Sequence, residues 1–145
     1  MAANTSPIFT LTPDVTWGAA DGNGGTAGPL KTANTAMDGT GTILTVFTAG
    51  VNGSYVSQLI ARPTGTNVAS VLRVFINNGS TNATIANNAL YTELNLPAST
   101  ANAAAALQGQ FALLNFALPA SYKINVTLGT TVAAGYVVMV QGGDY

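Results

Sequence analysis

The sequence contains no histidine and no cysteine. Without histidine, the chain lacks the commonest general base, the usual metal ligand and any Ser-His-Asp triad. Without cysteine it cannot form disulfides, thiolate nucleophiles or cysteine-based metal sites, and its redox compartment stays undetermined. Acid–base chemistry would depend on carboxylates alone. The sequence therefore predicts no enzyme, no metal site and no cofactor.

Charge of either sign is scarce as well. Four Lys/Arg and five Asp/Glu residues make up 6% of the chain, against about 25% in an ordinary soluble domain. A net charge of −1 supplies no long-range attraction for nucleic acid. A net charge near zero also gives little repulsion between copies, which promotes association. Asn, Thr and Ser supply the polar surface instead, a composition that favours packing against copies of the same chain or against another protein.

Long apolar runs are absent, although 48% of the residues are hydrophobic. Asn, Thr, Gly or Pro interrupts every run before the roughly 18 residues that a membrane-spanning helix needs. The first residues, MAANTSPIF, have neither the basic nor the apolar region of a signal peptide. We therefore expect no membrane partner, a mature chain that begins at or near Met1, and synthesis in a cytoplasm.

The five carboxylates could support glycoside hydrolysis if two of them met at roughly 5–9.5 Å in a cleft. Three lie in Gly/Pro-rich surroundings, one is next to the C-terminus, and Glu93 lies within an apolar run, where it can face solvent beside Arg73 or Lys123. Asp is a common turn former. The sequence therefore predicts turn residues and exposed charges at all five positions, which are Asp14, Asp21, Asp38, Glu93 and Asp144.

Two glycine-rich motifs resemble ligand-binding loops without completing them. Asp21-Gly-Asn-Gly-Gly begins like a calcium loop but lacks the third oxygen ligand and the distal Glu, and the same holds for Asp38-Gly-Thr-Gly. The stretch Gly22–Gly28 is similar to a phosphate-binding loop, but no Lys-Ser/Thr follows it and no helix begins there. We expect neither a cation nor a phosphate at these positions.

Residues 1–40 and 41–145 differ in character. The first part contains Pro7 and Pro13 and five glycines within residues 18–28, so we expect an extended, poorly structured N-terminal arm with one short strand around Asp14–Gly18. The second part contains seven short runs rich in β-branched and aromatic residues. These runs, the predicted strands, are 42–48, 54–62, 70–77, 89–96, 110–118, 121–129 and 135–141.

The pattern within these runs predicts a single-domain, all-β sandwich of the jelly-roll kind. In the sixth run, Tyr122, Ile124, Val126 and Leu128 alternate with polar residues, as in a half-buried strand. In the third, we expect Leu72, Val74 and Ile76 to face the core and Arg73 to point outward. Asn52-Gly53 favours a type I′ hairpin, and the Ala-rich stretch 101–107 is too short for an independent helix.

Aromatic residues offer two interpretations. An exposed set could form a sugar-binding platform, whereas aromatics also dominate cores and protein interfaces. Core or interface packing is the prediction for most of them, and Trp17 and Tyr145, in less regular regions, are the candidate interface anchors. The set comprises Trp17, Tyr55, Tyr91, Tyr122, Tyr136 and Tyr145.

The last third of the chain resembles the C-terminal part of small virion proteins of tailed bacteriophages. The matching features are Leu118-Pro119-Ala120-Ser121-Tyr122-Lys123-Ile124, Leu128-Gly129-Thr130, Ala133-Ala134-Gly135-Tyr136 and Gly142-Gly143-Asp144-Tyr145. The segment ARPTGTNVASVLRVFINNG is similar to the same group, so the likeness covers about residues 40–145.

This resemblance implies a capsid decoration, or cement, protein. Such proteins are commonly jelly-roll or related β-domains that bind the major capsid protein on the outer surface of the head as homotrimers, often with an extended terminal arm. The expected location is therefore the virion surface. The alternatives are a carbohydrate-binding β-sandwich, acting in receptor binding or as a head ornament, and a carboxylate-based enzyme.

Overall fold

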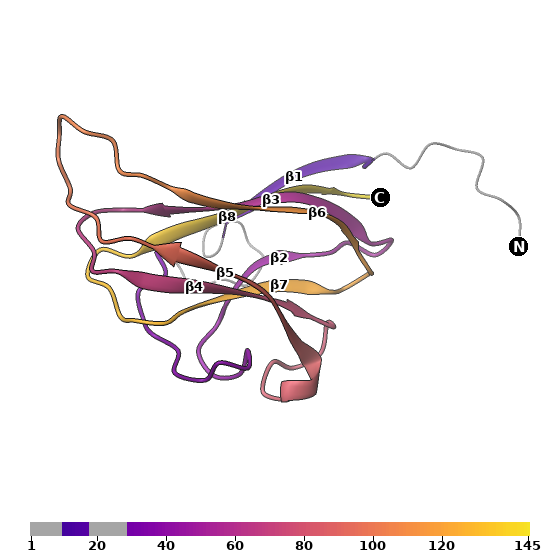
Figure 1. Cartoon of the computed structure of the whole chain (residues 1–145). Helices are drawn as coiled ribbons and strands as arrows, with labels where there is room; N and C mark the ends of the chain where they lie inside the picture. The colour runs from indigo at the N-terminus through magenta and orange to yellow at the C-terminus, as the bar shows by residue number, and fades with distance from the viewer. Residues whose placement is uncertain (1–9, 18–28) are drawn as a thin grey trace, which may run out of the picture.

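Two antiparallel four-stranded sheets, packed face to face, form the architecture of the protein (Figure 1). The computed structural model describes residues 10–17 and 29–145. One short 3-10 helix, η1 (Ile85–Asn87), precedes a strand, and the described residues contain no longer helix. The predicted β-sandwich is therefore confirmed.

Sheet A forms the upper layer in Figure 1. Its strands, in spatial order, are β1 (Thr12–Trp17), β8 (Tyr136–Asp144), β3 (Ser54–Pro63) and β6 (Gln110–Leu118). The short strand expected within residues 1–40 is β1, which pairs along its whole length with β8. This part of the N-terminal region thus belongs to the sandwich.

Sheet B forms the lower layer. Its strands, in spatial order, are β2 (Leu44–Thr48), β7 (Lys123–Leu128), β4 (Ser70–Asn77) and β5 (Asn88–Leu96). The two strand orders, β1-β8-β3-β6 and β2-β7-β4-β5, are those of a jelly roll, in which eight strands form two Greek keys. The edge strands β5 and β6 lie on the same side of the sandwich.

The core fills the space between the sheets and is apolar throughout. The apolar half of the alternation predicted for β7 is confirmed, because Ile124, Val126 and Leu128 are fully buried in the core and Tyr122 packs against it. The prediction of a half-buried strand is wrong, because Asn125 and Thr127 on the other side are buried too. Further core residues that are fully buried include Val46, Phe47, Val56, Leu59, Ala61, Leu72, Val138 and Val140. Burial of each large side chain stabilises the fold by about 1.5–3 kcal/mol, so this core can hold the domain without disulfides.

The hairpin predicted at Asn52-Gly53 is wrong. Gly53 has a φ of +86°, but Asn52 is not among the described residues with positive φ, as a type I′ turn would require. The N–H of Gly53 donates to the carbonyl of Gly50 at 3.0 Å. The strands on either side of this turn, β2 and β3, lie in different sheets. The connection therefore crosses from one layer to the other, which a hairpin turn cannot do.

Candidate docking face

The side of sheet A that faces away from the core is mostly apolar. Residues directly opposite one another on neighbouring antiparallel strands share a face, so the register identifies one row as Phe111, Ile60 and Met139. The next row is Leu113, Gln58 and Gln141. We call this surface the sheet A outer face and define it by Val15, Gln58, Ile60, Arg62, Phe111, Leu113, Val137, Met139 and Gln141.

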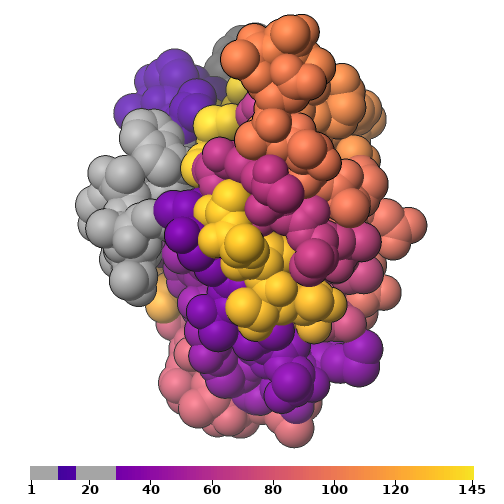
Figure 2. All heavy atoms as spheres, turned by 90° about the vertical axis from the view of Figure 1, so that its left-hand side faces the viewer, coloured from indigo at the N-terminus to yellow at the C-terminus, as the bar shows by residue number. Residues whose placement is uncertain are grey.

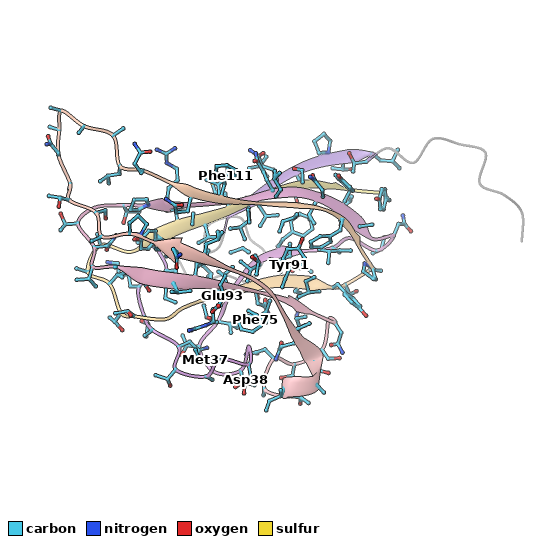
Figure 3. All side chains as sticks on the ribbon, viewed as in Figure 1. Met37, Asp38, Phe75, Tyr91, Glu93 and Phe111 are labelled. Atoms are coloured by element: carbon cyan, nitrogen blue, oxygen red, sulfur yellow. The ribbon has the colours of Figure 1, made fainter. Side chains whose placement is uncertain are left out.

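The large side chains at the margins of this face are open to solvent. The exposed fractions are 66% for Phe111, 63% for Leu113 and 51% for Val15. Phe111 lies on the side of sheet A that points away from sheet B (Figure 3). Contiguous apolar surface of this kind marks a contact site or an aggregation hazard, and the second applies most strongly on an edge strand such as β6.

The opposite outer face, on sheet B, is covered. The chain from Pro29 to Ile43 pairs with the end of β7, where the N–H of Asn34 donates to the carbonyl of Leu128 at 2.7 Å. The outward-facing side chains of Asn125 and Thr127 on β7 are buried. Phe75, which lies outside the core cluster, is 1% exposed, and a Cβ added at Gly39 would lie 3.0 Å from its ring. The outer face of sheet B is thus covered by the chain itself, whereas the described residues leave the outer face of sheet A open to solvent.

The cover over sheet B buries several polar groups together with their partners, although Oγ1 of Thr127 on the same face is buried without a hydrogen-bond partner among the described residues. The buried side chain of Asn34 donates to the carbonyls of Thr40 and Thr42, both at 2.7 Å, which shapes the covering loop. The hydroxyl of Thr45 donates to Asn125 at 2.8 Å. Met37 and Asp38 lie on the far side of sheet B from the core (Figure 3).

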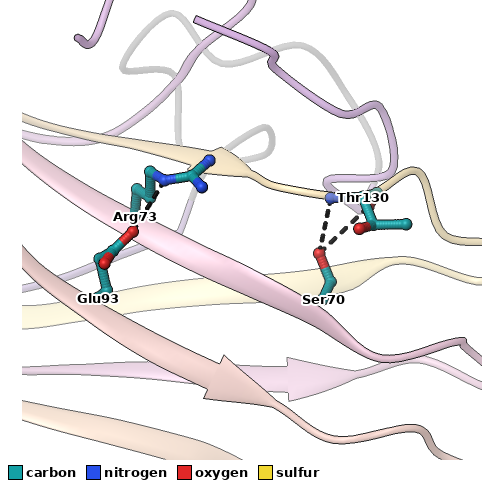
Figure 4. A network of polar contacts seen from close by, with 4 residues as sticks. All are labelled: Ser70, Arg73, Glu93 and Thr130. Atoms are coloured by element: carbon teal, nitrogen blue, oxygen red, sulfur yellow. Dashed lines mark hydrogen bonds and ion pairs between the residues drawn. The ribbon is translucent and has the colours of Figure 1, made fainter. Parts of the chain in front are cut away.

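Arg73 is less exposed to solvent than the outward-facing residue expected from the sequence. It lies on the outer side of β4, but its side chain is only 9% exposed. Its Nε donates to Oε1 of Glu93 at 2.9 Å, so the expected pairing of Glu93 with a cation is confirmed (Figure 4). Close by on the same strand, the hydroxyl of Ser70 accepts from the N–H of Thr130 at 3.0 Å.

A shallow hollow of about 280 Å³ lies on the sheet A outer face. Gln58, Ile60 and Arg62 come from alternate positions of β3, so they point to the same side. Gly109, Gln110 and Phe111 supply the other wall. A Cβ at Gly109 would lie 3.2 Å from Cγ of Arg62, so the absence of a side chain there makes room for the stem of that arginine.

A second hollow, of about 220 Å³, is formed within the connection between β5 and β6, by residues 97–100 and 106–108. The Ala-rich stretch 101–107 is a loop, as predicted. Figure 2 shows this end of the molecule, with the β5–β6 connection in orange at the top.

The side chain of Tyr136 contacts the β5–β6 connection, because its hydroxyl donates to the carbonyl of Pro97 at 3.4 Å. Burial raises the pKa of Tyr136, and a hydrogen bond with Ser99 opposes that effect.

Two of the described carboxylates lie within strands and not in turns as predicted: Asp14 in β1 and Asp144 in β8 are diagonal neighbours in the register of that strand pair. Asp144 accepts hydrogen bonds from the hydroxyl of Ser54 and the N–H of Gly50. Asp38 accepts from the hydroxyl and the N–H of Thr40, and these bonds lower the pKa of its carboxyl. Glu93 is on β5. Within the described ranges no three potential metal-binding side chains gather. Asp21 and the loop Gly22–Gly28 lie outside the described residues.

The described tyrosines do not assemble into a platform. Tyr136 is buried in the core, and Tyr122 packs against it. Tyr91 packs on Phe116, with ring centroids 5.0 Å apart, at the side where β5 and β6 approach each other. The hydroxyl of Tyr55 donates to Asn115 at 3.4 Å.

Of the two candidate interface anchors, the structure describes the contacts of Tyr145 but only the backbone of Trp17. The N–H of Tyr145 donates to the carbonyl of Gly53 at 3.1 Å, and a Cβ at Gly53 would lie 3.7 Å from the Tyr145 ring. Tyr145 therefore contacts the turn before β3 in its own chain. Trp17 ends β1 opposite Met139, and its side chain lies outside the part that the structure describes.

Sequence reasoning missed Phe111 and Leu113 as surface residues. The run QFALLNFAL was correctly predicted as a strand with the bounds of β6. Its apolar residues occupy both alternating sets, which is typical of a strand buried on both faces. The signal that could have identified them is this two-sided pattern on a strand that ends up at a sheet edge.

No known protein family matches the chain, and no curated protein sequence matches it either. None of the helices in the described residues has the length and apolar character to cross a membrane.

Proposed function

We propose that this chain is a structural protein of a tailed-phage virion, a decoration or cement protein that binds the outer surface of the capsid and stabilises it. The observation that carries the proposal is the sheet A outer face, which the described residues leave open while the outer face of sheet B is covered. The resemblance of residues 40–145 to phage virion proteins supports the choice of a capsid as the partner.

The energetics of docking support a role in many copies. Removing the exposed part of Phe111, Leu113 or Val15 from water on contact stabilises the complex by about 1–2 kcal/mol each when burial is complete. Their neighbours on this face are half-buried apolar residues and neutral amides, which can be covered without burying many charges. As a homotrimer, the protein would engage several subunits of the major capsid protein together, so that the contacts act at high effective concentration.

The arrangement of polar groups supports a structural role over an enzymatic one. The hydrogen bonds of Asp38 and Asp144 lie within loops and strand ends of the chain itself, and Glu93 pairs with Arg73. General acid–base catalysis needs a proton donor and acceptor aimed at one point in a cleft. Neither the hollow beside Arg62 nor the hollow in the β5–β6 connection has a carboxylate in its walls.

Sedimentation with phage heads tests the proposal. Particles of the phage that encodes the chain should contain it in stoichiometric amount, and heads stripped of it should bind the purified protein again. The substitutions Phe111→Asp and Leu113→Asp place a charge on the sheet A outer face and should weaken binding at least about tenfold each. The matched control is Ile85→Asp in η1, because Ile85 is 61% exposed but lies away from this face.

Two results would contradict the proposal. One is the absence of the chain from purified particles. The other is unchanged binding of Phe111→Asp to stripped heads, with Ile85→Asp behaving identically. Circular dichroism of each variant should match that of the unaltered protein, since the substituted side chains lie outside the core cluster.

A further inference from the structure

Arg62 is the only charged residue among those that define the sheet A outer face. No described residue forms an ion pair or hydrogen bond with its guanidinium, in contrast to Arg73, which is paired with Glu93. Its stem lies over Gly109, which carries no side chain, and its head lines the same hollow as Phe111 and Ile60. The geometry therefore sets one exposed cation beside the apolar side chains of Phe111 and Ile60 and the amide of Gln58, at a face that we propose to be covered.

Covering this face with a purely apolar partner would be unfavourable. An arginine taken out of water without a partner loses its hydration, and this penalty is large for a buried ion. A carboxylate placed opposite it restores the lost interactions through two parallel N–H···O bonds, because the guanidinium fork matches the two carboxylate oxygens. The apolar side chains of Ile60 and Phe111 strengthen this attraction, since they lower the local dielectric constant once the partner covers them.

We infer that the hollow beside Arg62 receives an acidic side chain of the capsid subunit, with Phe111 and Ile60 packing against the methylene groups of that side chain. The inference rests on the proposed capsid-binding function and adds the chemistry of the partner. Charge complementarity is the argument for this occupant: the face offers one positive charge and the partner supplies one negative charge. Gln58 lines the same hollow; its amide donates one N–H to the side-chain oxygen of Gln141, and the second N–H can donate to a carboxylate oxygen.

The hollow matches a single side chain better than a larger polyanion. Its volume of about 280 Å³ lies just below the range of roughly 300–1,000 Å³ that is typical of ligand sites. Nucleic acid binding depends on several Lys or Arg residues that neutralise successive phosphates. The sheet A outer face supplies only Arg62, because Lys31 precedes β2 and Lys123 begins β7 of sheet B.

Binding isotherms of the purified protein on stripped heads test the inference. Arg62→Gln should weaken binding at least about tenfold, because the partner's carboxylate would then be buried without a cation. Arg62→Glu should weaken it further through like-charge repulsion, and Arg62→Lys should fall between Arg62→Gln and the unaltered protein. The matched control is Lys123→Gln, which removes an equal charge on sheet B and should change binding less than twofold. Thermal melts of all four variants should coincide, since neither side chain makes a described ion pair.

The outcomes separate the inference from the function on which it rests. If the unaltered protein binds heads and Arg62→Gln binds equally well, the inference is overturned and the proposed function stands. If the unaltered protein does not bind heads, the proposed function itself fails. If Arg62→Gln instead dissociates the homotrimer in sedimentation equilibrium, the occupant is a second copy. If the unaltered protein binds uronate- or sialate-containing glycans and Arg62→Gln does not, the occupant is an acidic sugar. Either of these last two results overturns the inference.

Discussion

Phe111 of β6 lies directly opposite Ile60 of β3, on the side of sheet A that faces away from the core. Ile60 is in turn opposite Met139 of β8, so three apolar side chains cross three neighbouring strands in one row. Such a row is ordinary inside a sandwich and unusual on its surface. The behaviour of the protein in solution should reflect it.

Free protein should therefore associate through this row. We expect the unaltered chain to bind an environment-sensitive hydrophobic dye and to show concentration-dependent association in light scattering. The double substitution Phe111→Ser, Leu113→Ser should reduce both signals, because it removes the two most exposed apolar side chains of the sheet A outer face. The matched control is Val51→Ser, which changes an exposed residue in the turn before β3. Equal dye binding by the double variant and the control would count against the assignment of this face.

The Arg73–Glu93 pair should contribute modestly to stability. Glu93→Gln leaves the nearly buried guanidinium without its anion, while water still reaches the half-exposed position 93. We therefore expect a loss of about 1 kcal/mol in the free energy of unfolding. In the double variant Arg73→Met, Glu93→Gln, part of this loss should be recovered, because no charge remains to be desolvated. Urea denaturation of the two single variants and the double variant measures the coupling, and strict additivity would show that the pair contributes nothing.

Asn67 should be among the most sensitive polar residues. Its carbonyl oxygen accepts from the N–H groups of Ala134 and Gly135, at 2.8 and 2.9 Å, and its amide donates to the carbonyl of Gly135 at 3.0 Å. Asn67→Ala leaves these buried groups without partners, which should cost about 2 kcal/mol or more.

The control for that substitution is Asn102→Ala, since Asn102 is exposed and bonds only within its own turn. It should change the free energy of unfolding by less than about 0.5 kcal/mol. Comparable losses in the two variants, measured by thermal or urea unfolding, would mean that Asn67 does not hold the β3–β4 and β7–β8 connections together.

Alkaline pH should destabilise the protein through Tyr136. Burial raises the pKa of this phenol above the ordinary value of 10.0, so the folded state binds its proton more tightly than the unfolded state does. The stabilising contribution is thus fully present below pH 10 and is lost as the pH rises through the folded-state pKa. In Tyr136→Phe this part of the pH dependence should disappear. Unfolding midpoints measured between pH 8 and about pH 11 check it, and identical slopes for the two proteins would contradict it.

The sequence predicted which residues form strands better than it predicted which faces of those strands are buried. The bounds of β4 and β6 were predicted to the residue, because β-branched and aromatic runs bounded by turn residues are a local signal. Which face of β6 stays open is a tertiary property: it depends on what packs against sheet A, and the alternation within the strand does not report this. The near-complete burial of the Arg73 side chain was missed for the same reason, because it depends on what packs on the outer face of sheet B.

At Asn52-Gly53 the local sequence signal predicted the wrong type of turn. Asn-Gly between two strands favours a hairpin when both strands belong to one sheet. Here the jelly-roll order sends β2 and β3 to different sheets, so the topology overrides the local preference. Gly53 keeps its positive φ, and a Cβ there would lie 2.7 Å from the carbonyl oxygen of Leu118. The glycine was therefore informative about the backbone, although the turn type inferred from it was wrong.

Electron cryomicroscopy of the intact virus particle tests the central claim most directly. The account predicts density for the jelly roll on the outside of the head, with the strands of sheet A against the major capsid protein and sheet B toward the solvent. Density in which the row Phe111–Ile60–Met139 faces open solvent would contradict it, as would a particle in which the chain cannot be traced.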